Sequence, residues 1–251
     1  MSGLRTVIDQ MDQEVTFSFP PKRIVSLVPS QTEFLLDIGA PVVGRTKFCV
    51  HPSDLVDDIQ IIGGTKNFRF EKIKELAPDL IIGNKEENYQ AGINQLRHDF
   101  PVWMSDNHTL KDAFSMMSSL GVLCQEEVRA ETIIEECTKA LHKVKDAFDA
   151  TVVYLIWKDP WMAVGRHTFV DHMLTHLGYR NLIKIDRYPE LDTATIKAQQ
   201  PDKVLLSSEP YPFKRADLSQ VRALWPNAEI ELVDGELFSW YGSRLRKWSL
   251  N

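Results

Sequence analysis

The sequence predicts an α/β protein of two lobes, each with a central, mostly parallel sheet flanked by helices, joined by one long rigid helix. Three observations predict it: an uninterrupted helical pattern in mid-chain, an alternation of short apolar segments with helical segments, and a repeat of that alternation on either side of the long helix. We therefore expect an N-terminal lobe over residues 1–123, a connecting helix over 124–149 and a C-terminal lobe over 150–251.

The connecting helix is predicted by the stretch from Gln125 to Phe148, which contains neither Gly nor Pro. Acidic residues fill its first half and basic residues its second, a polarity that suits the helix dipole. Apolar residues recur at helical spacing and predict one buried stripe along a charged surface. The stripe consists of Ala130, Ile133, Ile134, Cys137, Leu141, Val144 and Phe148.

The first lobe opens with a loosely alternating stretch, Thr6 to Phe19, which predicts a short hairpin. The apolar run Arg23 to Val28 is typical of a buried parallel strand. Ser30 and Glu33 have the spacing of a capping box, so a helix is expected to begin at Gln31. Ligands of open α/β proteins collect where such strands run into helices. Further strands are expected at 42–44, 80–82 and 102–104, and further helices at 71–76, 89–98 and 110–120.

After the connecting helix the pattern restarts with an apolar strand, Thr151 to Trp157, a loop or hairpin, and a helix capped by Thr168 and Asp171. The stretches Ile73 to Glu87 and Ile196 to Glu209 share an Ile-Lys pair, a Pro-Asp pair, an apolar strand and a following Glu. This repeat predicts a duplicated protein whose two lobes leave a cleft for a small molecule.

Composition excludes several classes of protein. The chain has 251 residues, 43% hydrophobic, and a net charge of -6, which argues against nucleic-acid binding. Cys49, Cys124 and Cys137 are too few and scattered for a disulfide framework, so buried reduced thiols are expected. No stretch has transmembrane length. As the sequence stands we expect a cytoplasmic protein, and a periplasmic or membrane-anchored one if a leader has been removed.

Motifs of common enzymes are missing: there is no GxSxG, Walker A, GxGxxG or HExxH pattern. His172 and His176 have a metal-ligand spacing, but the apolar residues around them mark the opposite, buried face of their helix. We predict no catalytic residue, no intrinsic cofactor and no metal site. A small-molecule binding protein is favoured, and a cytoplasmic enzyme or a sensor built on the same two-lobed scaffold is the alternative.

Loop residues supply the candidate ligand contacts. Phe238-Ser239-Trp240-Tyr241 lies between Asp-Gly and Gly-Ser pairs, which predicts an exposed aromatic loop, with a core position as the alternative. Glu86, Glu87 and Glu209 follow strands and are either solvated carboxylates or contacts for a ligand or partner.

Several segments together resemble a known family: RIVSLVPSQTEFLLDIG, VVG, IGGT, FEKIKELAPDLII and PWMAVGRHTFVDHMLTHLGYRNLI. They are similar to the substrate-binding components of ABC importers for cobalamin, haem and iron-siderophores, closest to the cobalamin-binding type. The resemblance implies non-enzymatic binding of a macrocyclic or metal-chelate ligand between the lobes, a corrinoid first, then haem or a ferric siderophore. The implied ligand-binding residues are Phe48, Lys66, Trp157, Tyr188, Glu236 and Trp240, with Tyr241 added from the aromatic loop.

Two positions depart from the family pattern. Lys66 stands where the cobalamin binder carries an aromatic residue, which suggests a ligand with an anionic group. The family presents one acidic residue per lobe to the membrane permease, and the repeat register assigns these positions to Glu71 and Ala194. Only the first carboxylate is present, so we expect ligand binding but weak docking on a cobalamin-type permease.

Overall fold

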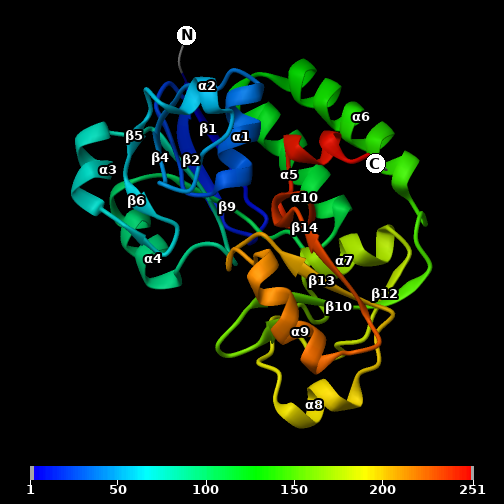
Figure 1. Cartoon of the computed structure of the whole chain (residues 1–251). Coiled ribbons are helices and arrows are strands. Elements are labelled where there is room, and N and C mark those ends of the chain that lie inside the picture. The colour runs from blue at the N-terminus through cyan, green and yellow to red at the C-terminus, as the bar shows by residue number, and fades with distance from the viewer. Residues whose placement is uncertain (1–2, 250–251) are drawn as a thin grey trace. The chain divides into compact units, whose positions relative to one another are not determined.

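The computed structural model describes residues 3–249, which form two compact α/β units (Figure 1). The ends of the predicted lobes, 1–2 and 250–251, lie outside these residues. The first unit contains the described residues up to Asn107, then Lys111–Lys139 and Tyr241–Arg246. The second unit contains His108–Leu110, Ala140–Trp240 and the described residues from Lys247. The lobe boundaries given by the sequence stay a prediction.

The first unit contains a five-stranded parallel sheet in the order β5-β4-β3-β8-β9. Its central strands are buried along their whole length, as the short apolar runs predict for strands covered on both faces. The strands are β3 (Ile24–Ser26), β4 (Val42–Arg45), β5 (Gln60–Ile61), β8 (Leu80–Asn84) and β9 (Val102–Ser105).

The second unit contains a sheet in which β12, β10, β13 and β14 pair in parallel, with β11 antiparallel to β10. The parallel order β12-β10-β13-β14 matches β4-β3-β8-β9 of the first unit, so the repeat read from the sequence is also a repeat of topology. The strands are β10 (Ala150–Trp157), β11 (Met162–Ala163), β12 (Tyr179–Asn181), β13 (Lys203–Ser207) and β14 (Glu229–Val233).

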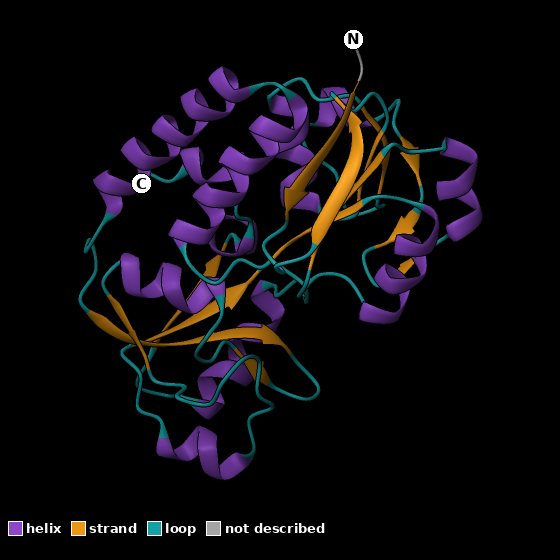
Figure 2. Cartoon of the chain, turned by 180° about the vertical axis from the view of Figure 1, so that it is seen from behind, coloured by secondary structure: helices purple, strands orange, loops and turns teal. Residues whose placement is uncertain are grey.

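Helices alternate with the strands along the chain and pack against both sheets. Figure 2 shows the helices in purple and the strands in orange from behind. Together with the parallel sheets they confirm the predicted fold class. The first-unit helices are α1 (Pro29–Asp37), α2 (Ser53–Val56), α3 (Phe70–Leu76), α4 (Gln90–Asp99) and α5 (Leu110–Cys124). Those of the second unit are α7 (Phe169–His176), α8 (Thr193–Ala198), η1 (Arg215–Asp217), α9 (Leu218–Leu224) and α10 (Gly235–Ser239), and η2 (Ser243–Lys247) lies near the C-terminus.

The connecting helix is α6 (Glu127–Val144), shorter at both ends than predicted. Gln125 and Asp146 have φ angles of 61° and 52°, which end a right-handed helix on either side. Phe148, expected on the helix stripe, instead stacks on Tyr179 with ring centroids 4.5 Å apart. The remaining stripe is confirmed, since its residues from Ala130 to Val144 are buried apart from the half-buried Ile134.

Two further predictions on helix ends are wrong. Helix α1 begins at Pro29, before the expected Gln31, and no side chain caps it. Glu33, expected to complete a capping box, forms a buried ion pair with Arg244 instead. Helix α5 continues through Gly121, where a Cβ atom would lie 2.5 Å from the Ala130 side chain, so this glycine permits α5 and α6 to pack closely rather than ending a helix.

Two small antiparallel hairpins complete the first unit. The predicted N-terminal hairpin is β1 (Gly3–Ile8) with β2 (Glu14–Phe19), and β6 (Gly63–Gly64) pairs with β7 (Asn67–Phe68). Within the described residues, no helix is both long enough and apolar enough for a membrane span.

Candidate functional site

Each unit presents one exposed aromatic side chain at the carboxyl end of its parallel sheet. Among the described residues, Phe48 and Trp157 alone of the aromatic side chains are exposed, with 51% and 39% of their surface accessible. Phe48 follows β4, and Trp157 is the last residue of β10. An aromatic ring left in water at this edge of an α/β sheet is typical of a ligand-contact residue.

Phe48 is held by the loop after β4 and by the β6–β7 hairpin. Its backbone N–H donates to the Thr46 hydroxyl at 3.3 Å, and the N–H of Lys47 donates to the Gly63 carbonyl at 2.8 Å. The ring packs so closely on Gly64 that a Cβ atom there would lie 3.3 Å from Phe48 Cε2. The ring therefore lies close to the hairpin, while 51% of the surface of Phe48 stays accessible.

Lys66 lies in the turn of the same hairpin, and its ammonium group donates to the backbone carbonyl of Glu86. The structure thus places the predicted residues Phe48 and Lys66 on contacting loops of the first unit. Glu86 belongs to the loop after β8, so this loop also contacts the β6–β7 hairpin.

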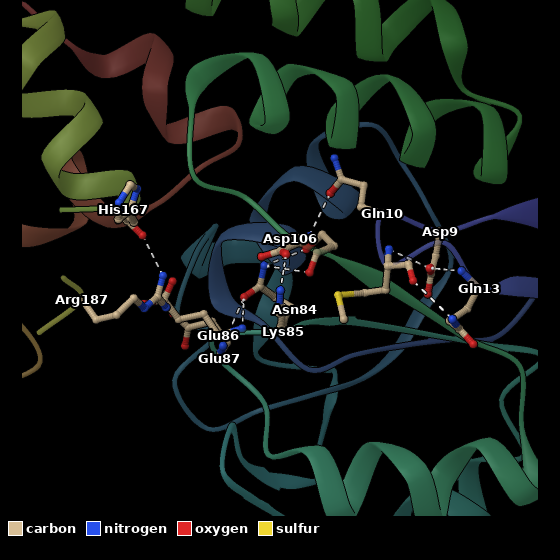
Figure 3. Close-up of polar contacts among 12 residues, drawn as sticks. Asp9, Gln10, Gln13, Asn84, Lys85, Glu86, Glu87, Asp106, His167 and Arg187 are labelled. Atoms are coloured by element: carbon tan, nitrogen blue, oxygen red, sulfur yellow. Dashed lines mark hydrogen bonds and ion pairs between the residues drawn. The ribbon is translucent and has the colours of Figure 1, made fainter.

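Two asparagines shape the loop after β8. Asn84 Oδ1 accepts from the N–H groups of Glu86 at 2.8 Å and Glu87 at 3.1 Å (Figure 3). Asn88 Oδ1 accepts from Asn84 N–H at 2.9 Å, and its Nδ2 donates to the carbonyls of Leu27 and Thr65. Since both asparagine side chains are buried, the loop and the hairpin at Thr65 are fixed together.

The second unit holds Trp157 in an aromatic cluster. Its ring meets Tyr211 edge to face at a centroid distance of 5.7 Å, and Tyr211 meets Phe213 at 4.7 Å. Tyr211 lies in the loop after β13, the counterpart of the loop after β8. Tyr211 is not among the residues predicted from the sequence, although its position between Pro210 and Pro212, beyond a buried strand, is a signal that marks it.

Trp240 and Tyr241 are buried, with 7% and 6% of their surface accessible, so the expected exposed aromatic loop is wrong. Helix α10 occupies part of that stretch, and the Trp240 indole N–H donates to Glu209 Oε1 at 3.0 Å. Glu236, also predicted as a ligand residue, is half-buried in the first turn of α10. Roles for these three side chains in ligand binding stay a prediction.

Glu209 links the loop after β13 to α10. Its Oε1 also accepts from the Ser239 hydroxyl at 2.5 Å. Burial raises the pKa of the Glu209 carboxyl above its usual value, although the hydrogen bonds from Ser239 and Trp240 act in the opposite direction. This carboxylate therefore bonds within the second unit, so the first of the two alternatives expected for it, a solvated carboxylate, is wrong. The second, a contact with a ligand or partner, stays a prediction.

Tyr188, the remaining predicted ligand residue, is half-buried on the loop that follows β12. The Arg187 guanidinium lies 5.7 Å from the Tyr188 ring centroid and donates to the His167 carbonyl at 2.7 Å (Figure 3). The tyrosine thus carries a cation against one of its faces.

The predicted docking positions have matching surroundings. Glu71 is the second residue of α3 and Ala194 the second residue of α8, and both are exposed. Each helix ends before a Pro-Asp pair and a buried strand, so the two positions are structurally equivalent. Ala194 carries no charge to match Glu71.

The cysteines provide no nucleophile. All three are buried and free. Burial raises the pKa of the Cys124 and Cys137 thiols to about 12 and raises that of Cys49 as well. A nucleophilic cysteine needs the thiolate at neutral pH, which these values disfavour. The surfaces around Phe48 and Trp157 are instead suited to holding a ligand.

Comparison with known proteins gives one family. The model of a family described as periplasmic binding protein matches residues 24–223. An uncharacterized ABC transporter substrate-binding lipoprotein, YvrC of Bacillus subtilis, is 25% identical over 190 residues, which cover 70% of this chain and 60% of that protein. A vitamin B12-binding protein of Pectobacterium carotovorum is 20% identical over 90% of this chain and 84% of its own length.

A solved structure has the same fold. A periplasmic heme-binding protein from Pseudomonas aeruginosa superposes with a TM-score of 0.78 at 22% identity, covering 90% of this chain and 89% of that one. This similarity and the family match confirm both the resemblance read from the sequence and the predicted fold class.

Proposed function

The chain belongs to the periplasmic binding protein family, and on that premise we propose that it binds a ring-shaped small molecule without converting it. The ligand class is a corrinoid first, then haem or a ferric siderophore. Relatives named for vitamin B12 and a structural neighbour named for heme support this class. A cleft between the lobes as the place of binding stays a prediction.

One observation carries the proposal: the aromatic side chains exposed in the described residues are one per unit, Phe48 and Trp157, each at the carboxyl edge of a parallel sheet. A flat, largely apolar macrocycle gains most from rigid rings, which bury a large area with little loss of conformational entropy. Tyr211, packed against Trp157, extends the aromatic surface of the second unit.

The test is a titration with cobalamin, cobinamide, haem and ferric siderophores, followed by tryptophan fluorescence and ligand absorbance. Phe48→Ala and Trp157→Ala should each weaken the binding of the accepted ligand by about tenfold, the loss typical of a central aromatic contact. Val128→Ala, which shortens a highly exposed side chain on α6, is the control and should bind normally.

Other outcomes would contradict the proposal. Chemical turnover of a bound ligand would favour the enzyme alternative, and capture of a protein partner without binding of any probe would favour the sensor. A variant that loses thermal stability but keeps its affinity would assign that aromatic residue to the core.

The partner in this proposal is the permease of an ABC importer, with the chain periplasmic or anchored to the membrane. The name of the YvrC relative, a substrate-binding lipoprotein, supports this assignment. Glu71, exposed in the first turn of α3, is the proposed docking carboxylate.

A further inference from the structure

Two lysine side chains accompany the exposed ring of Phe48. Lys47 Nζ lies 4.8 Å from the centroid of the ring. Lys66 lies two residues from Gly64, where a Cβ atom would lie 3.3 Å from Phe48 Cε2. Both lysines are exposed, and the loop after β4 and the β6–β7 hairpin that carry them contact each other through Lys47 N–H and the Gly63 carbonyl.

The backbone that carries these lysines is fixed. The N–H of Lys47 donates to Gly63, and the Thr65 carbonyl accepts from the buried Asn88. Gly63 has a φ of 122°, and a Cβ atom there would lie 2.7 Å from the Asn67 carbonyl oxygen, so the tight hairpin requires this glycine. Lys66 therefore projects from a rigid turn rather than from a free loop.

In the part of the chain that the structure describes, the partners of the two lysines are neutral. Lys47 contacts an aromatic ring, and Lys66 donates to the Glu86 carbonyl. By contrast, Lys74 pairs with Asp99 at 3.2 Å and Lys85 with Asp106 at 2.6 Å. A ring or a carbonyl orients an ammonium group but does not neutralise it.

We infer that the ligand carries an anionic oxygen group, a carboxylate or a phosphate, beside its flat ring system, and that Lys47 and Lys66 bind this group while Phe48 contacts the ring. The inference rests on the proposed function and assigns the anionic group and the ring system of the ligand to different side chains of the first unit. An ammonium group binds carboxylate and phosphate oxygens by charge-assisted hydrogen bonds, and these strengthen where an apolar ring excludes water. Within residues 3–249 neither ammonium group has a carboxylate partner, which is consistent with a ligand that brings the opposite charge.

The experiment compares two pairs of probes that differ in this anionic group. Haem carries two carboxylates that haem dimethyl ester lacks, and cobalamin carries a phosphodiester that cobinamide lacks. The first pair tests a carboxylate and the second a phosphate. Dissociation constants are measured by absorbance and tryptophan fluorescence at low and at moderate salt for the unmodified chain and for Lys47→Met, Lys66→Met and the double variant.

Each single variant should weaken the binding of the anionic probe about three- to tenfold and leave the ester or cobinamide unchanged. The double variant should also lose most of the salt dependence. Lys74→Met removes an exposed lysine that already has a carboxylate partner, and it should leave every affinity unchanged. Unaltered thermal midpoints confirm that all variants fold.

Equal affinity of the unmodified chain for both members of a pair it binds would overturn the inference and leave the proposed function intact. The same loss for anionic and neutral probes in the lysine variants would also overturn it, because the lysines would then act through the shape of the loop. Failure of all four probes and of ferric siderophores to bind would remove the proposed function itself, and the inference with it.

Discussion

The loop after β8 and the loop after β13 occupy equivalent places in two sheets of the same strand order, yet different groups hold them. In the first unit, side-chain amides of Asn84 and Asn88 make the bonds. In the second, the Glu209 carboxylate binds Ser239 and Trp240, and the buried Ser207 hydroxyl donates to the Glu209 carbonyl at 2.5 Å. Amides do not titrate, whereas a buried carboxylate does.

This difference shows that two sheets with a repeated topology can hold equivalent loops through groups that differ in their response to pH. The first loop fixes the hairpin that presents Lys66 through side-chain amides, whose charge does not change with pH. The second loop positions an indole through a group whose charge depends on its surroundings. The shared topology thus determines where the two loops lie, and the side chains at the ends of β8 and β13 determine how each loop responds to pH.

The largest expected effect is at Asn88. Asn88→Ala removes one acceptor and two donor contacts in a buried place and leaves the carbonyls of Leu27 and Thr65 without this partner. The free energy of unfolding should fall by about 2–4 kcal/mol. Denaturant unfolding measures it, with the exposed Asn94→Ala on α4 as a control that should change little. A loss below about 1 kcal/mol would show that the first loop does not depend on its amides.

Local signals explain which parts of the fold the sequence predicted well. Thr168 caps α7 as expected, with its hydroxyl accepting from the Asp171 N–H at 3.1 Å, because such a cap needs only neighbouring residues. The same spacing at Ser30 and Glu33 gave a wrong prediction of a capping box, since Pro29 begins the helix and Glu33 pairs with Arg244, 211 residues away. Contacts at that separation leave no periodic trace in a sequence.

The candidate site divides in the same way. Phe48 follows β4 and Trp157 ends β10, and both are exposed. Positions at the ends of apolar strands can be recognised in the sequence alone. Trp240 and Tyr241 looked like loop residues, but α10 and the bond to Glu209 bury this stretch. Tyr211 was missed because its place beside Trp157 depends on the pairing of β10 with β13, which brings the two loops together.

The next expected effect is a pH dependence of the free energy of unfolding that arises from one carboxyl group in the second unit, that of Glu209. The folded-state pKa of Glu209 is raised above its unfolded value of about 4.3, so the folded state binds this proton more tightly. The contribution of Glu209 to stability is therefore fully present below about pH 4.3 and is lost as the pH rises through the raised pKa.

Glu209→Gln tests this sign, because the amide oxygen can still accept from Ser239 and Trp240 but has no proton to lose. The free energy of unfolding of the unmodified chain, relative to this variant, should decline as the pH rises from about 4.3 through the raised pKa of Glu209. Glu75→Gln, an exposed carboxylate on α3, should follow the unmodified chain. Identical pH profiles for the chain and Glu209→Gln would contradict a titrating loop.

The smallest expected effect concerns docking, where the two units differ by one charge. Glu71 and Ala194 hold the second place of α3 and α8. Asp192 cannot readily substitute, because its carboxylate accepts from the Thr195 N–H at 2.7 Å as the cap of α8, and this bonding lowers its pKa.

On the proposed function, an exposed carboxylate at the edge of an interface contributes modestly and mainly at low salt. Ala194→Glu should therefore strengthen binding to a cobalamin-type permease in detergent about two- to fivefold, with ligand affinity unchanged. Glu71→Ala should weaken binding by a similar factor, and moderate salt should reduce both changes. Titration of the permease with each variant measures them. Tight binding by the unmodified chain that Glu71→Ala leaves unaffected would mean that docking uses another surface. The exposed Glu190, just before α8, would then be the first residue to substitute.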